Sequence, residues 1–301
     1  MAPKDHFRYS YEIDLDTDTT ASKILHLVGQ EKRVLECGCG PGHMTSVLVE
    51  HFRCEVTGIE IDKEAAREAE TFCQRVICGD LDVLNLEECL EGYKFDVAVF
   101  ADVLEHLKDP GRSLRQAHKI LAPEGYVVIS VPNIAYAGLM ADLLQGRFRY
   151  REKGLLDATH LRFFTAETLK DMLEDTGYSV EVWDRYRVVP EYTEFGDSLQ
   201  QIPSTVKDFL LQGHEALTYQ FIVKALPWSP EGRALDCKTG NVLKDEMPSP
   251  IHSSLSEDAV EQLRKEIKEL KKTLSQIQTS KSWKITAPLR TVRHWLTYWS
   301  R

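Results

Sequence analysis

The chain has 301 residues, of which 43% are hydrophobic and 28% charged, a balance typical of soluble globular proteins. Its formal net charge of −10 disfavours a protein that holds nucleic-acid phosphates over its whole surface, and we expect no nucleic-acid partner. No stretch approaches the roughly 20 consecutive apolar residues that span a bilayer, and the first residues lack the apolar core of a signal peptide. None of the seven cysteines forms a CxxC pair. We therefore expect a cytoplasmic protein with reduced cysteines.

Short apolar runs alternate with helical patterns between residues 33 and 131. The runs are rich in β-branched residues and too short for stable helices, which predicts strands at Arg33–Glu36, Glu55–Ile61, Arg75–Ile77, Asp96–Phe100 and Tyr126–Val131. Apolar spacing between them predicts helices at Met44–His51, Lys63–Thr71, Leu84–Leu90 and Gly111–Leu121. This alternation is typical of an α/β fold, with a doubly wound, mostly parallel sheet and helices on both faces.

The rhythm breaks after residue 132, and the segment Asn133–Phe164 is expected to be irregular. Thr165 is a suitable N-cap for a helix over Ala166–Thr176, which Gly177 would end. Two more strand-like runs follow, at Tyr178–Val189 and Leu217–Ala225. We place the domain built from all these elements at residues 1–226.

The composition changes from residue 227 onward. Prolines, serines and glycines without periodicity predict a linker at 227–256. Apolar residues spaced 3-4-3-4-3 from Val260 to Ile277 predict a short coiled-coil helix at 257–279, which would either pair two copies or pack on its own domain. Residues 280–301 hold five lysines or arginines, three tryptophans and no acid, a composition that favours a bilayer interface.

A glycine-rich turn joins the first predicted strand to the first helix, in the run Val34–Gly42 (VLECGCGPG). Its glycines allow a tight backbone and close contact with a ligand, and the following helix N-terminus favours a polar or anionic group. The spacing is GxGxG rather than GxGxxG, which disfavours a dehydrogenase. Glu60 and Asp80 then follow the second and third strands, where nucleotide-binding sheets place acids. The set predicts a nucleoside-containing cofactor.

In this order the motifs resemble those of class I methyltransferases that use S-adenosylmethionine (SAM), from about Tyr9 to Ala225. LECGCGPG resembles motif I, GIEID the ribose-binding acid motif, CGDL the adenine motif and FDVAVFADVLEHLKDP the motif after strand four. The resemblance implies SAM as cofactor and a Rossmann-like fold with a final antiparallel strand, which Leu217–Ala225 would supply. It also implies the cofactor-binding residues Glu36, Gly38, Gly40, Gly42, Glu60, Asp80, Leu81, Phe100 and Ala101. Positions 36 and 60 hold glutamate where many members have aspartate.

Methyl transfer mainly requires alignment of the acceptor, and a hydroxyl acceptor also requires a base. His106 is one candidate, and Asp102 and Glu105 would share its face if that stretch were helical. The other lies in the polar loop DATHLRFF, so the predicted catalytic residues are His160, His106 and Asp157.

The LEHL…DP pattern also resembles quinone-biosynthesis O-methyltransferases, in which acids and a histidine at this spacing suggest a divalent metal. Asp102 replaces a glutamate of that pattern, which weakens the ligand set. We predict no metal and keep a divalent ion at Asp102, Glu105 and His106 as the alternative.

The run GLLDATHLRFFT after VPN resembles methyltransferases found among bacterial cell-surface polysaccharide genes. This implies O-methylation of a sugar in cell-surface glycan biosynthesis. A quinone or lipid precursor is the alternative acceptor, and a non-catalytic scaffold of a glycan-assembly complex is the alternative class of protein. The run SWKITAPLR resembles C-terminal segments of bacterial glycosyltransferases. The tail would therefore contact such an enzyme or the inner membrane surface, and the coiled coil would form a homodimer.

Overall fold

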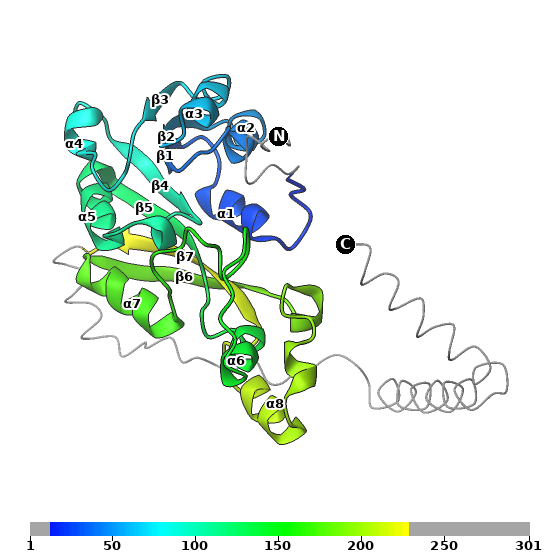
Figure 1. Ribbon diagram of the computed structural model, residues 1–301. Coiled ribbons are helices and arrows are strands. Elements are labelled where there is room, and N and C mark those ends of the chain that lie inside the picture. Colours follow the sequence, from blue (N-terminus) through cyan, green and yellow to red (C-terminus); the bar gives the residue numbers. More distant parts are fainter. Residues whose placement is uncertain (1–12, 229–301) are drawn as a thin grey trace, which may run out of the picture. The chain divides into compact units, whose positions relative to one another are not determined.

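We describe the protein from a computed structural model, which defines residues 13–228 (Figure 1). The predicted linker, coiled coil and basic tail lie outside these residues, apart from the first two positions of the linker. The strands are β1 (Arg33–Cys37), β2 (Glu55–Glu60), β3 (Arg75–Cys78), β4 (Phe95–Ala101), β5 (Leu121–Pro132), β6 (Tyr178–Arg187) and β7 (Thr218–Pro227). The α-helices are α1 (Thr20–Val28), α2 (His43–Glu50), α3 (Lys63–Ala69), α4 (Leu86–Cys89), α5 (Pro110–Ile120), α6 (Ala137–Leu144), α7 (Ala166–Asp175) and α8 (Ser204–Leu211).

The seven strands form one sheet in the order β3-β2-β1-β4-β5-β7-β6. β1 to β5 pair in parallel, and β7 lies antiparallel between β5 and β6. The fold is therefore the expected α/β fold with a mostly parallel sheet. The strand order reverses between β1 and β4, and open α/β sheets bind ligands at the carboxyl ends of the strands beside such a reversal.

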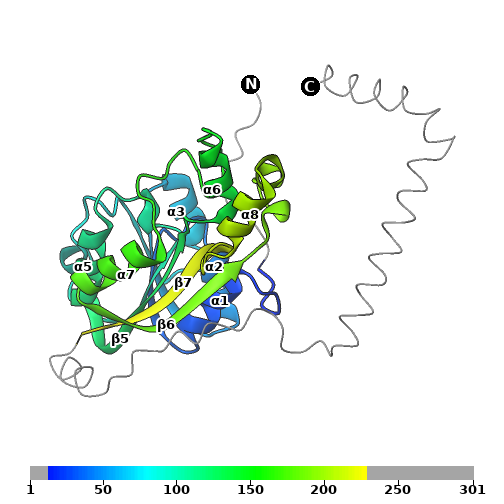
Figure 2. The ribbon, with the colours of Figure 1, turned by 90° about the horizontal axis from the view of Figure 1, so that it is seen from below.

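Helices cover both faces of the sheet, because both faces of its central strands are apolar. Leu114 of α5 and Leu169 of α7 belong to one fully buried cluster, and Leu25 of α1 and Leu48 of α2 belong to the other. Figure 2 shows α5 and α7 on one side of the sheet and α1 and α2 on the other. These two apolar layers hold the strand ends in fixed positions.

The ends of the elements follow local chemistry. Thr165 caps α7 in a capping box with Thr168, and Gly177 follows the helix with a left-handed φ of 87°, as predicted. The helix expected at Leu84–Leu90 is shorter, because Asn85 caps it from inside the predicted range. The condition for a shared face at residues 102–106, that this stretch be helical, is not met. Only a 3₁₀ turn, Leu104–His106, is present, and Asp102 precedes it with a left-handed φ of 53°.

Among residues 13–228, no helix is both long and apolar enough to cross a membrane.

Candidate functional site

A cavity of about 1050 Å³ opens at the carboxyl ends of the strands around the β1–β4 reversal. This exceeds the usual range of small-molecule sites, roughly 300–1000 Å³, so it has room for a nucleoside and a second molecule. Of the twelve residues predicted for cofactor binding and catalysis, nine line it: Glu36, Gly38, Gly40, Glu60, Asp80, Leu81, Ala101, His106 and His160.

The glycine-rich turn forms one wall of the cavity. Gly38 has a φ of 71°, and a Cβ atom there would lie 2.6 Å from Cγ2 of Val103. Gly42 has a φ of 92° and faces Ala69 and Phe72 instead of the cavity. Gly40 donates its backbone N–H to Oε2 of Glu60 across 2.8 Å. The glycines are needed here because a side chain would collide with neighbours or strain the backbone.

Backbone N–H groups fix the carboxylates that follow β2 and β3. Oε1 of Glu60 accepts a 2.8 Å hydrogen bond from the N–H of Asp62, so both oxygens of Glu60 are oriented by the backbone. Oδ1 of Asp80 accepts a bond of the same length from the N–H of Asp82. Two acceptors fixed in this way at the ends of neighbouring strands suit hydroxyl and amino groups of a nucleoside.

Glu36 lies at the end of β1 and is only 3% exposed. Its Oε2 accepts a 2.6 Å hydrogen bond from the hydroxyl of Thr45 on α2. Burial raises the pKa of this carboxyl to about 8, against the opposing effect of the Thr45 bond. A cationic ligand group would favour its ionised form.

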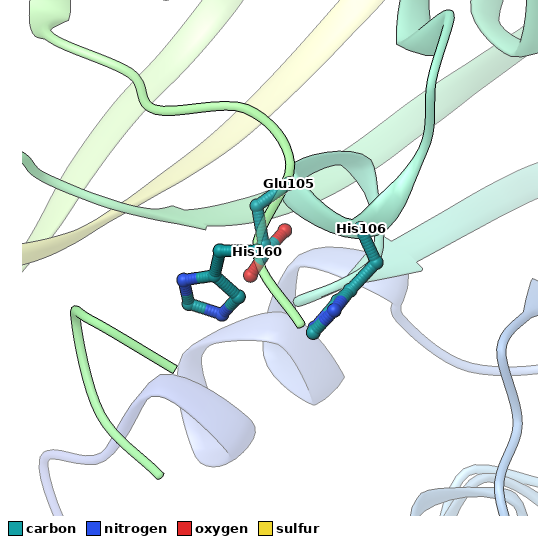
Figure 3. A group of neighbouring side chains, drawn as sticks. All are labelled: Glu105, His106 and His160. Carbon is teal, nitrogen blue, oxygen red and sulfur yellow. The ribbon is translucent and has the colours of Figure 1, made fainter. Parts of the chain in front are cut away.

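Three titratable side chains gather at the other end of the cavity. Each of Glu105, His106 and His160 has one oxygen or nitrogen atom that lies within 4.8 Å of such an atom in the other two. Figure 3 shows the Glu105 carboxylate between the two imidazole rings. Both oxygens of Glu105 are buried without a hydrogen-bond partner. Burial, and then the neighbouring Asp102, raise the pKa of Glu105 well above its usual range.

The loop around His160 orients this cluster. Nδ1 of His160 lies 3.1 Å from the carbonyl oxygen of Leu155, and Nδ1 of His106 lies 3.0 Å from the hydroxyl of Thr159. The backbone carbonyl of Glu105 accepts the N–H groups of the two residues after His160. A carboxylate and two imidazoles are suited to proton transfer, and they are also ligands that divalent metals accept.

The alternative metal set predicted from the sequence included Asp102 instead of His160. Oδ1 of Asp102 accepts hydrogen bonds from Ser130 and Gln220, and the structure brings His160 rather than Asp102 into the cluster.

Two other predicted residues do not line the cavity. Asp157 is fully buried, and its Oδ1 accepts hydrogen bonds from the N–H and the hydroxyl of Thr159, which holds the loop in place. Phe100 is also fully buried, in the core below the cavity wall.

Sequence reasoning missed several parts of the cavity wall. Thr20 and Ile24 come from α1, and Tyr186, Tyr219 and Gln220 come from β6 and β7. The helix α1 had a local signal, because Thr19 forms a capping box with Ser22 ahead of an amphipathic run. The contribution of β6 and β7 had none, since it depends on the strand order.

Comparison with protein families gives a match over residues 13–181 to a model described as a methyltransferase domain. A probable S-adenosylmethionine-dependent methyltransferase of Mycolicibacterium smegmatis is 29% identical over 149 residues, which cover 49% of this chain and 52% of that protein. A ubiquinone biosynthesis O-methyltransferase of Psychrobacter arcticus is 27% identical over 156 residues, covering 49% of this chain and 59% of that protein. The matches thus span about half the length of these curated relatives.

Among solved structures, magnesium protoporphyrin IX methyltransferase from Synechocystis, with bound S-adenosylhomocysteine (SAH), has a TM-score of 0.47 and 17% identity. The match covers 69% of this chain and 82% of that one.

Proposed function

Because this chain belongs to the methyltransferase-domain family, whose methyl donor is SAM, we propose that it transfers the methyl group of SAM to an acceptor bound in the same cavity. The observation that carries this proposal is the continuity of the cavity. One space joins the glycine turn and the acids after β2 and β3 to the histidine cluster after β4.

We assign the cofactor residues as follows. Glu36 and the turn Gly38–Gly42 surround the methionine portion of SAM, and the buried carboxylate of Glu36 pairs with its ammonium group. Glu60 accepts hydrogen bonds from the ribose hydroxyls. Asp80 and the backbone of Leu81 hold the adenine, and Ala101 forms the adjoining wall. The cavity position and fixed carboxylates described above support these roles.

The reaction is a displacement in which an acceptor atom attacks the sulfonium methyl group. The protein therefore aligns the two molecules and excludes water from them. His160 or His106 takes up the proton of a hydroxyl acceptor, because both line the cavity that also contains the glycine turn.

The acceptor that we propose is a sugar hydroxyl in cell-surface glycan biosynthesis. The loop sequence that resembles polysaccharide-associated methyltransferases supports it, as do the polar groups Tyr186, Tyr219 and Gln220 in the cavity wall. A contact of the C-terminal tail with a glycosyltransferase or an anionic membrane surface, and pairing through the coiled coil, belong to the same proposal. A quinone precursor is the second candidate, since several curated relatives are ubiquinone biosynthesis O-methyltransferases.

The cofactor assignment is tested by calorimetry on the full chain. Glu60→Ala should weaken SAM binding by about 30-fold or more, because a charged hydrogen-bond acceptor worth roughly 2–3 kcal/mol is lost. Asp80→Ala should also weaken it. Glu68→Ala, on the exposed face of α3, is the matched control. Unchanged affinity in both cavity variants would refute the assignment.

Turnover is tested by incubation with SAM and panels of nucleotide-sugars, lipid-linked glycans and quinone precursors, with mass spectrometry of the products. With an acceptor found, His160→Ala or His106→Ala should lower turnover by ~10²–10⁴-fold while SAM still binds. His51→Ala, exposed and outside the cavity, is the control. Near-normal turnover in both cavity variants would exclude these histidines as the base.

A further inference from the structure

The backbone of Asp102 adopts a left-handed conformation, which is uncommon for residues other than glycine. Its φ is 53°, in the left-handed region, at the residue after the central strand β4. In the described part of the chain, three other non-glycine residues have a positive φ, namely Glu31, Arg53 and Glu91, and all three are exposed and outside the cavity. Asp102 alone among the four lines the cavity. Strain retained at such a place indicates a requirement for that side chain.

Three elements hold one end of the Asp102 carboxylate. Oδ1 accepts hydrogen bonds from the hydroxyl of Ser130 on β5 (2.6 Å) and from Nε2 of Gln220 on β7 (2.9 Å). The hydroxyl of Thr20 on α1 in turn donates to Oε1 of Gln220. The backbone N–H of Asp102 donates to the carbonyl oxygen and hydroxyl of Ser130. No hydrogen bond from the described residues reaches Oδ2, so this oxygen remains for a ligand in the cavity.

Along the chain, Asp102 lies between residues of the predicted cofactor wall and residues of the histidine cluster, and it lines the same cavity as both. Ala101, the residue before it, belongs to the cofactor wall, while Glu105 and His106 belong to the cluster. The transferred methyl group must lie between this wall and the cluster, because the donor contacts one and the acceptor the other. A carboxylate beside the transferred methyl group would attract the positive charge of the sulfonium.

We propose that Asp102 is a catalytic residue of the methyl transfer, whose Oδ2 faces the sulfonium of SAM and accepts a hydrogen bond from the attacking hydroxyl of the acceptor. This inference rests on the proposed function and adds to it a residue and a requirement on the acceptor. The acceptor must carry a hydrogen on the atom that is methylated.

The step balances in atoms and charge. The hydroxyl oxygen forms a bond to the methyl carbon, the bond from this carbon to sulfur breaks, and its electron pair stays on sulfur to give a neutral thioether. The hydroxyl proton moves along its hydrogen bond to Oδ2 of Asp102. A neutral histidine of the cluster then takes the proton from Asp102, which restores the carboxylate.

The proposal is tested by ligand binding, which needs no identified acceptor. The probes are SAM, SAH and sinefungin, an analogue in which an amino-bearing carbon replaces the methylated sulfur. SAM and sinefungin carry a positive charge at the reacting position and SAH does not. Calorimetry on the full-length wild type and on Asp102→Asn should show SAM and sinefungin weakened by about tenfold, the order expected for one charged interaction, with SAH changed less than twofold.

Asp82→Asn is the matched control, because Asp82 also lines the cavity but follows β3, on the cofactor side. It should affect the three ligands equally. An unchanged ratio of SAM to SAH affinity in Asp102→Asn would overturn the proposal. If the wild type itself bound none of the three ligands, the proposed function would fail first, so the two failures are distinguishable.

Thermal unfolding separates this role from a structural one. Asparagine tolerates the left-handed region better than aspartate, and it can accept the same two hydrogen bonds. Asp102→Asn should therefore melt a few degrees higher than the wild type, as expected where function retains strain. A lower melting temperature would show that Asp102 serves the fold and would overturn the proposal.

Discussion

Replacing Glu36 by glutamine tests the buried carboxyl at the cofactor end of the cavity. Glutamine has nearly the same shape and can accept the hydrogen bond from Thr45, but it carries no charge at any pH. The wild-type carboxyl ionises near 4.5 in the unfolded chain and at about 8 in the folded protein, because burial disfavours its charged form.

The sign and size of the effect follow from these two values. Between pH 4.5 and about 8, the folded protein holds a proton on Glu36 that the unfolded chain releases. The free energy of unfolding of the wild type therefore falls as the pH rises through this window, and the loss is complete above it. At ~1.4 kcal/mol for each pKa unit, the loss is at most about 5 kcal/mol. Glu36→Gln lacks this contribution.

The assay is urea unfolding followed by circular dichroism at about pH 5 and about pH 8.5. The variant should match the wild type within ~1 kcal/mol at the lower pH and exceed it by several kcal/mol at the higher pH. Glu68→Gln, whose side chain is exposed, controls for the general effect of removing a carboxylate. Parallel pH dependence of the wild type and Glu36→Gln would refute the reasoning.

Two further predictions concern the glycine turn and the strand pair below it. Gly38→Ala should weaken SAM binding more than tenfold, because the added Cβ would collide with Val103. Gly40→Ala should weaken it less, since no atom lies within 4 Å of a Cβ at that position. Equal losses of affinity in calorimetry would contradict this. Asp96→Asn should lower stability by about 1 kcal/mol at neutral pH, because it breaks a partly exposed pair with Arg33 that keeps the pKa of Asp96 low. The stabilisation by this pair is present above pH 3.8 and is lost as the pH falls below it. The difference in unfolding free energy between the wild type and Asp96→Asn should therefore be smaller at about pH 3 than at neutral pH. An equal difference at both pH values in urea unfolding would count against the pair.

The sequence by itself determined the features that depend on neighbours along the chain. The strands and helices from β1 to β5 follow from apolar spacing and β-branched composition, and the order of elements predicts the parallel sheet. The glycine turn needed no tertiary information, because a strand, a GxGxG run and a helix are contiguous in the chain. Glu60 and Asp80 were predicted at strand ends on the same grounds, and both line the cavity.

Only the tertiary structure decided which distant groups meet at the acceptor end of the cavity. β7 inserts between β5 and β6, and this strand order carries Gln220 to Asp102, 118 residues earlier in the chain. The backbone of the loop after residue 157 forms hydrogen bonds with Glu105, which places His160 beside His106. Asp157, three residues before His160, is buried instead, so the two predicted catalytic residues of this loop lie in different surroundings. No local pattern encodes such contacts, because they depend on strand order and on the packing of a loop whose own sequence has no periodicity.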